Sequence, residues 1–241
     1  MFITAKAQEA EETESEENIV MKLMGYKREN GRYGIRNHLL IIPASVCSSE
    51  TAVNIAKLVD GAIAIPHQHG CCEIGDDFDT TKRTLVGFGK NPNVGAVLVV
   101  GLGCEGIQAK DIADEIKTTG KPVEYIVIQE EGGTAKTVSK GVEIAGKMAR
   151  EISKQNKVEF DISEIILGLE CGGSDPTSGL ASNPSIGVAS DMLVSMGGSS
   201  ILSETTEVIG AEHLLYPRFE DENEGKKFLE MVKRVENRSI A

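Results

Sequence analysis

The sequence has no tryptophan and few other aromatic residues. Aromatic side chains make up only 4% of the 241 residues. Because bases and sugars are commonly held on aromatic stacking surfaces, we expect no platform of that kind. Basic residues are also in the minority, since 25 Lys and Arg stand against 37 Asp and Glu, which gives a formal charge of −12. Such a surface repels a polyanion, so the charge balance argues against a DNA- or RNA-binding module.

Long apolar runs and a signal peptide are lacking as well. No apolar run reaches the roughly 18 residues of a membrane-spanning helix. The first 20 residues carry six Glu and no apolar stretch, so they do not resemble a secretory signal. We therefore expect a cytoplasmic protein without a membrane contact, in which residues 1–20 form an acidic disordered arm or linker.

Apolar runs alternate with amphipathic segments along the rest of the chain. This alternation predicts an α/β fold, Rossmann-like and doubly wound, in which a mostly parallel sheet carries helices on both faces. We expect residues 21–160 to form a first α/β unit and residues 161–241 the start of a second. Strands are predicted over 39–46, 62–65, 94–100, 123–128, 165–169 and 199–202, and helices over 48–59 (capped by Ser48 or Ser49), 79–88, 107–119, 134–153, 186–196 and 222–238.

Every Cys follows a predicted strand. An odd count of five favours metal-binding or catalytic thiols over a framework of disulfides. In a doubly wound sheet, ligands bind beyond the carboxyl ends of the strands, so the Cys-bearing loops are expected to share one edge. A Cys beside a buried strand is more often a small apolar filler, and we favour that interpretation for Cys47. Of the adjacent Cys71 and Cys72, we expect one to face the site and the other the core.

Other polar residues in these loops are candidates for chemistry. The glycine loops around Cys104 and Cys171 also contain Glu105 and Glu170, and glycine there lets the backbone approach a ligand. His67 and His69 are each a candidate metal ligand or general base, and surface exposure is the alternative for one of them.

The sequence suggests fewer chemical roles for the arginines and the remaining histidines. Arg28, Arg32 and Arg36 are candidate clamps for a carboxylate, with a solvated loop face between 22 and 37 as the equal alternative. His38 and His213 are expected to be structural. The GLGCEG segment at 101–106 spells a dinucleotide-binding pattern, but no acidic residue follows at the ribose position except the loose match Glu130.

Taken together, the loops resemble the altronate/galactarate dehydratase family. The motifs that carry the resemblance are GYKRENGRYGIRN at 25–37, HQHGCC at 67–72, GLGCEG at 101–106, and LECGGSDPTSG at 169–179 followed by Asn183 and Pro184. The resemblance runs from about Met24 to about Gly210. The family also includes the large subunit of sulfolactate sulfo-lyase, and its members carry a small N-terminal domain and a longer C-terminal section that this sequence does not show.

The resemblance implies a metal-dependent hydro-lyase that removes water from a sugar acid to give a 2-keto-3-deoxy acid. We expect a divalent metal, Fe²⁺ before Mn²⁺, a small partner subunit and a homo-oligomer, with the chain as the central portion of the enzyme or one half of a split enzyme. The expected metal ligands are Cys71, Cys72, Cys104 and Cys171, the acid–base candidates are His67, His69, Glu105, Glu130 and Glu170, and the substrate-binding candidates are Arg32, Arg36, Gly172, Gly173 and Ser174.

Four alternatives remain open at this stage. Three Cys residues from three loops could hold an iron–sulfur cluster with one open iron. The leaving group could be sulfite, as in a sulfolactate sulfo-lyase. The chain could be a non-catalytic subunit that binds a sugar acid or stabilises a partner. A nucleotide-binding Rossmann domain, which NAD would stabilise, is the least favoured.

Overall fold

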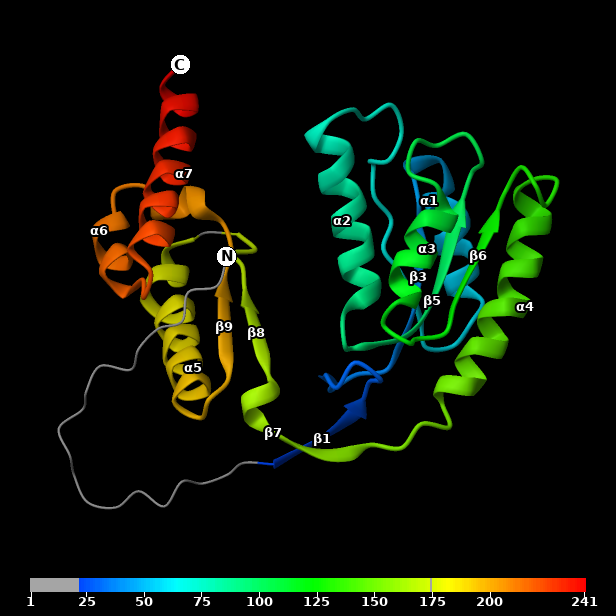
Figure 1. Ribbon diagram of the computed structural model, residues 1–241, viewed down its shortest axis with the longest axis horizontal. Coiled ribbons are helices and arrows are strands. Elements are labelled where there is room, and N and C mark those ends of the chain that lie inside the picture. The colour runs from blue at the N-terminus through cyan, green and yellow to red at the C-terminus, as the bar shows by residue number, and fades with distance from the viewer. Residues whose placement is uncertain (1–21, 174) are drawn as a thin grey trace. The chain divides into compact units, whose positions relative to one another are not determined.

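The computed structural model describes residues 22–173 and 175–241 (Figure 1). These residues form two compact units. One contains residues 24–159, and the other contains residues 160–241 with Lys22 and Leu23. The predicted acidic arm at 1–20 lies outside the described residues.

A parallel sheet of four strands forms the centre of the first unit. The strands are β3 (His38–Pro43), β4 (Ala62–Ala64), β5 (Val94–Gly101) and β6 (Val123–Val127), in the order β4-β3-β5-β6. The helices between and after them are α1 (Val46–Lys57), α2 (Asp76–Lys90), α3 (Ala109–Lys117) and α4 (Thr134–Ile152). The predicted α/β fold with a parallel sheet is confirmed.

Helices cover both faces of this sheet, which explains the unbroken apolar sequence of β5. All eight residues of that strand are buried, as a strand covered on both sides requires. Leu40 and Ile42 pack on the side of α2 and α3, whereas Leu39 and Ile41 pack on the side of α1 and α4. Side chains alternate along a strand, so each strand contributes to both layers of the core.

The strand order places a topological switch point between β3 and β5. From β3 the chain crosses to β4 at one edge, and it then returns to add β5 and β6 on the other side. The loops after β3 and β5 therefore leave the sheet in opposite directions and open a crevice at its carboxyl edge. Cys47 lies in the first turn of the helix after β3, and Cys104 lies in the loop after β5.

Two local predictions are wrong in the first unit. Helix α1 begins after Ser45. Ser48 lies inside the helix, where its hydroxyl accepts the Ser45 N–H at 3.4 Å. The segment 22–37 is not a loop alone, because β1 (Lys22–Lys27) pairs antiparallel with β2 (Tyr33–Gly34). A further strand, β7 (Val158–Asp161), completes a small sheet in the order β2-β1-β7.

The second unit is built on a parallel pair of strands, β8 (Ile166–Leu169) and β9 (Ser199–Leu202). The helices are α5 (Asn183–Ser195), α6 (Glu212–Leu215) and α7 (Glu222–Ile240). Phe228 and Val232 of α7 are buried, and the Phe228 ring lies 5.3 Å from that of Phe219. Short turns of helix occupy Ile162–Glu164, Ser178–Ser182, Thr205–Val208 and Tyr216–Arg218. Among the described residues, no helix is long and apolar enough to cross a membrane.

Candidate active site

The loop after β4 is fastened to the carboxyl end of β3. Gly70 has a φ of +86°, and a Cβ placed there would lie 2.3 Å from the Ala44 carbonyl oxygen. The Val46 N–H donates to the His69 carbonyl oxygen at 2.8 Å. Only glycine permits both this backbone conformation and this approach. The loop therefore crosses the end of β3 and carries its side chains to the switch point.

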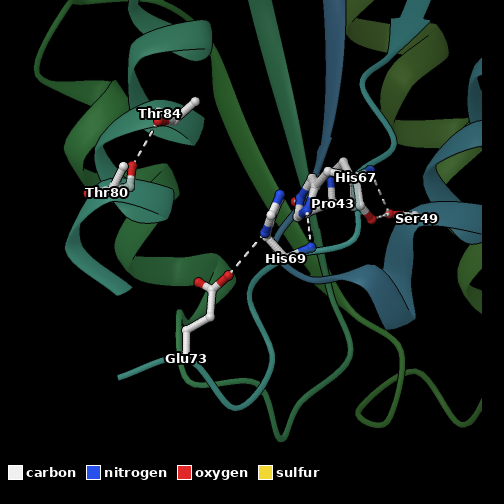
Figure 2. Close-up of polar contacts among 7 residues, drawn as sticks. All are labelled: Pro43, Ser49, His67, His69, Glu73, Thr80 and Thr84. Atoms are coloured by element: carbon white, nitrogen blue, oxygen red, sulfur yellow. Dashed lines mark hydrogen bonds and ion pairs between the residues drawn. The ribbon is translucent and has the colours of Figure 1, made fainter. Parts of the chain in front are cut away.

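His67 holds this loop in place. Its Nε2 donates to the Pro43 carbonyl at 2.8 Å, and its Nδ1 accepts the His69 N–H at 3.2 Å (Figure 2). The two contacts require the same tautomer, with the ring proton on Nε2. Ser49 Oγ also donates to the His67 carbonyl oxygen at 3.0 Å. Because both ring nitrogens are engaged, the ring has no nitrogen left for a metal ion or a substrate proton in this conformation.

His69 is the more available of the two histidines. Its side chain is 67% exposed, and its Nδ1 lies 3.3 Å from Glu73 Oε1 (Figure 2). The Glu73 side chain is only 16% exposed. Its Oε2 is buried without a hydrogen-bond partner among the described residues. A carboxylate next to one imidazole nitrogen orients the ring. It also stabilises the ring after the other nitrogen has accepted a proton, as in many acid–base sites. Glu73 is a residue that the sequence pattern did not predict as a candidate.

A cavity of about 550 Å³ opens beside this pair. Its far wall is α2, which contributes Thr80, Thr81 and Thr84, while Phe88 adds an apolar patch. Thr84 Oγ1 donates to the Thr80 carbonyl oxygen at 2.8 Å. The complete lining consists of Ile65, Pro66, His67, His69, Glu73, Asp77, Thr80, Thr81, Thr84, Leu85 and Phe88. The wall thus offers hydroxyl groups, two imidazole rings and two carboxylates, and the lining set contains no Lys or Arg.

Four sulfur atoms gather near the switch point. Cys47, Cys71, Cys72 and Cys104 are all exposed, and the Sγ atoms of Cys71 and Cys72 are 3.8 Å apart. The hydrogen bond with Cys72, and then the charges of Cys72, Cys47 and Cys104, raise the pKa of Cys71. Cys71 therefore lies within electrostatic range of the other three thiols, and the role of these cysteines as metal ligands stays a prediction. Two details are wrong: Cys47 is not a buried filler, and neither Cys71 nor Cys72 points into the core.

Glu105 supports the loop after β5 from inside. It is 3% exposed, and its Oε2 accepts the N–H groups of Leu102 at 3.0 Å and Gly103 at 2.6 Å. The carboxylate thereby fixes the turn that presents Cys104. Its buried position suits a structural role better than the acid–base role predicted for it. Glu130 follows β6 and is exposed.

The arginines lie at the opposite edge of the sheet. Arg36 precedes β3, and its N–H donates to Asn93 Oδ1 just before β5. Arg28 is 5% exposed and donates to the carbonyl oxygens of Pro92 and Arg36, so it ties the hairpin to the core. Arg32 lies in the turn of that hairpin and is exposed. The structure does not bring Arg32 or Arg36 to the thiol-bearing edge of their own unit.

The LECGGSDPTSG segment belongs to the second unit. Glu170 and Cys171 follow β8 and line a cavity of about 660 Å³ in that unit. The Cys171 N–H donates to Glu204 Oε2 at 2.7 Å. Asp175 Oδ1 accepts the N–H groups of Thr177 and Ser178, so it begins the helical turn before α5. Gly172 and Gly173 are exposed, and Ser174 lies outside the described residues.

The spacing of these donors decides whether they can hold a metal ion. The 3.8 Å between Cys71 and Cys72 matches two neighbouring thiolates on a tetrahedral ion, whose metal–sulfur bonds are about 2.3 Å. However, no group of three or more His, Cys, Asp or Glu side chains in the described part of the chain is arranged to hold a metal ion. Of the two histidines expected to be structural, His38 begins β3 and His213 lies exposed in α6.

The fold and these loops define an α/β protein whose candidate site lies at a switch point and combines thiols with an imidazole–carboxylate pair. Residues 25–153 match the second domain of D-galactarate dehydratase/altronate hydrolase. Residues 162–241 match the C-terminal domain of D-galactarate/altronate dehydratase. The chain therefore belongs to the galactarate/altronate dehydratase family.

Individual relatives are similar over most of this chain. It is 37% identical to (2R)-sulfolactate sulfo-lyase subunit beta of Chromohalobacter salexigens, over 88% of this chain and 54% of that protein. It is 32% identical to altronate dehydratase of Bacillus subtilis and 33% identical to that of Escherichia coli. Each of these two alignments covers 90% of this chain and 45% of the relative. The chain thus spans about half the length of the curated relatives it matches.

Proposed function

We propose that this chain carries the acid–base part of a lyase that performs β-elimination on a hydroxy acid. The observation that carries the proposal is the His69–Glu73 pair, 3.3 Å apart, at the wall of a 550 Å³ cavity beside the switch point. The family supports the reaction class, because its named relatives are dehydratases and a sulfo-lyase.

In the proposed reaction, His69 removes the proton on the carbon next to the substrate carboxylate. Glu73 on Nδ1 orients the ring so that Nε2 faces the cavity, and it stabilises the positive charge that the imidazole acquires. The electron pair left on that carbon forms a double bond to the neighbouring carbon as the bond to the leaving group breaks. For sulfolactate the leaving group departs as sulfite. For a sugar acid the departing hydroxyl takes up the proton held by His69 and leaves as water. In both cases the enol that remains becomes a 2-keto acid.

The hydroxyl row of α2 can bind a polyhydroxylated chain. Thr80 and Thr81 line the cavity on the side opposite the imidazole, and hydroxyl groups both donate and accept hydrogen bonds. Besides the histidines, the charged groups in the lining are Glu73 and Asp77, and both are negative. The substrate carboxylate therefore needs a positive partner that this lining does not supply. The described donors do not form a site for Fe²⁺ or Mn²⁺, so the steps above assign no role to a metal.

Our first assignment for the leaving group is water, lost from a sugar acid such as altronate or galactarate. Our second assignment is sulfite, lost from sulfolactate, and it is supported by the 37% identity to the sulfo-lyase subunit. That relative is named as a subunit beta, so we propose that this chain also works with a small partner subunit, and that the assembly is a homo-oligomer in the cytoplasm.

A substrate screen tests the proposal. The full-length protein, with and without a candidate partner subunit, is incubated with altronate, galactarate or sulfolactate, in the presence of ferrous iron, manganese or a chelator. We expect a 2-keto acid from one substrate, with sulfite as co-product only for sulfolactate. If the protein binds one of these acids but forms no keto acid in any condition, it is a binding subunit and the proposal is wrong. Thermal stabilisation by NAD alone would instead support a nucleotide-binding domain.

A further inference from the structure

The adjacent thiols of Cys71 and Cys72 form a chemical group that the elimination does not use. Their sulfur atoms are 3.8 Å apart, both side chains are exposed, and the described residues supply no third donor that would make them a metal site. Cys72 has a φ of +60°, a left-handed conformation that is strained for a non-glycine residue and that clusters at functional sites.

We propose that Cys71 and Cys72 are a reversible dithiol–disulfide site that reacts with low-molecular-weight disulfides such as glutathione disulfide. One thiolate attacks a sulfur of the small disulfide, whose S–S bond breaks and releases one thiol. The second cysteine thiolate then attacks the mixed disulfide, which forms the Cys71–Cys72 bond and releases the second small thiol. Two electrons pass from the cysteines to the oxidant, and the two cysteine protons end on the released thiols.

The geometry favours closure within the pair and easy reopening. A disulfide needs its sulfur atoms at about 2.0 Å, so closure requires an approach of somewhat less than 2 Å from the present distance. Neighbouring Cα atoms are about 3.8 Å apart, which is shorter than the separation most disulfides span. The closed ring is therefore strained, and strained, exposed disulfides are the readily reduced, regulatory kind.

The two sulfur atoms are 3.8 Å apart. Whichever thiolate attacks first, the other cysteine therefore lies beside the mixed disulfide and is placed for the second, resolving attack. Cys47 and Cys104 lie close enough for their charges to affect Cys71. They are the competing partners that an experiment has to distinguish.

The disulfide would lie in the segment that spaces His69 from Glu73. These residues are four apart, and their contact at 3.3 Å depends on the conformation of the two cysteines between them. Closing the Cys71–Cys72 ring changes that conformation and separates the imidazole from its carboxylate. Oxidation therefore switches off the elimination, a consequence that rests on the proposed function, whereas the disulfide itself does not.

Peptide mapping tests the disulfide directly. The full-length protein is reduced, exposed to mixtures of glutathione and glutathione disulfide, and alkylated, then digested with trypsin. Cleavage after Lys57, Lys82 and Lys90 places Cys47, the Cys71–Cys72 pair and Cys104 in separate peptides. We expect the peptide that ends at Lys82 to become lighter by two hydrogens and resist alkylation, and to recover in excess glutathione. Cross-linked peptides joining Cys47 or Cys104 to the pair, or an alkylated pair at all ratios, would overturn the proposal.

Activity under the same mixtures tests the switch, with Cys71→Ser as the comparison. We expect turnover to fall about 100-fold on oxidation, in line with loss of a positioned acid–base group. The fall should reverse with excess glutathione, and Cys71→Ser should not respond to the oxidant. If the disulfide forms and turnover is unchanged, the regulatory step is wrong while the disulfide stands. If no substrate turns over in any state, the proposed function fails and the peptide map still decides the disulfide.

Discussion

The anchoring of the loop at Gly70 predicts a large difference between two glycine substitutions. Gly70→Ala places a Cβ 2.3 Å from the Ala44 carbonyl oxygen and 2.9 Å from Ser45 Cα. Both neighbours are backbone atoms, so no side-chain rotation relieves the overlap. Gly61 has a similar φ of +77°, but a Cβ there meets nothing within 4 Å, so Gly61→Ala is a matched control for the backbone conformation alone.

The expected magnitudes follow from those contacts. Each alanine in a left-handed conformation costs about 1–2 kcal/mol, and overpacking at Gly70 adds about 1–3 kcal/mol. We therefore expect Gly61→Ala to lower the free energy of unfolding by about 1–2 kcal/mol and Gly70→Ala by about 2–5 kcal/mol, from the sum of the two costs.

Urea denaturation measures the free energies, and amide hydrogen exchange shows where the structure opens. In Gly70→Ala, the Val46 amide should lose protection, because its acceptor is the His69 carbonyl oxygen. Equal destabilisation by the two substitutions, with the Val46 amide still protected, would refute the anchoring of the loop.

Two further predictions concern buried charges. Burial lowers the pKa of Lys121 to about 8 from its ordinary 10.5. Between these two pH values the unfolded chain binds more protons than the folded chain, so the free energy of unfolding rises with pH. At about 1.4 kcal/mol per pH unit, the rise is at most about 3–4 kcal/mol. Urea denaturation at several pH values should show that rise, and Lys121→Met should lack it. Glu105→Ala removes the acceptor of two loop N–H groups, and we expect a loss of about 1–3 kcal/mol in the free energy of unfolding.

Each of these predictions has an exposed counterpart as control. Lys117 ends α3 with 45% of its side chain exposed, so Lys117→Met should keep the dependence of stability on pH seen in the unmodified protein. Glu143 forms a surface ion pair with Lys147, and such pairs contribute about 0–1 kcal/mol, so Glu143→Ala should cost less than Glu105→Ala. If Lys121→Met retains the rise, or if the two Glu variants are equally stable, the corresponding argument fails.

The sheet and its helices could be predicted because their signal is local. The apolar run of β5 and the amphipathic period of α3 place both elements within about two residues of the observed bounds. The β1–β2 hairpin was missed although Asn30-Gly31 is a hairpin signal, with Gly31 at a φ of +83°. Its strands are short and do not alternate cleanly, so the periodicity gave no support.

The sequence predicted which loops form the candidate site, but not which side chains meet within them. Strand order and the switch-point rule placed the thiols of the first unit at one edge, but the choice between His67 and His69 depended on a contact with the Pro43 carbonyl, 24 residues away. Glu73 was missed because it lies in an irregular loop, where spacing does not indicate which side chains meet. The arginines were misjudged for a related reason: the hairpin lies at the start of β3, and sequence alone did not show at which edge.

Turnover of a single variant tests the central claim most directly, that His69, held by Glu73 at the carboxyl edge, removes the substrate proton. The variant His69→Asn is compared with His213→Asn, which changes an exposed histidine of α6 in the other unit, using the substrate found in the screen and the complete assembly. The account predicts that kcat falls at least about 100-fold in His69→Asn, with unfolding temperatures unchanged and His213→Asn fully active. A kcat for His69→Asn equal to that of the unmodified protein would contradict it.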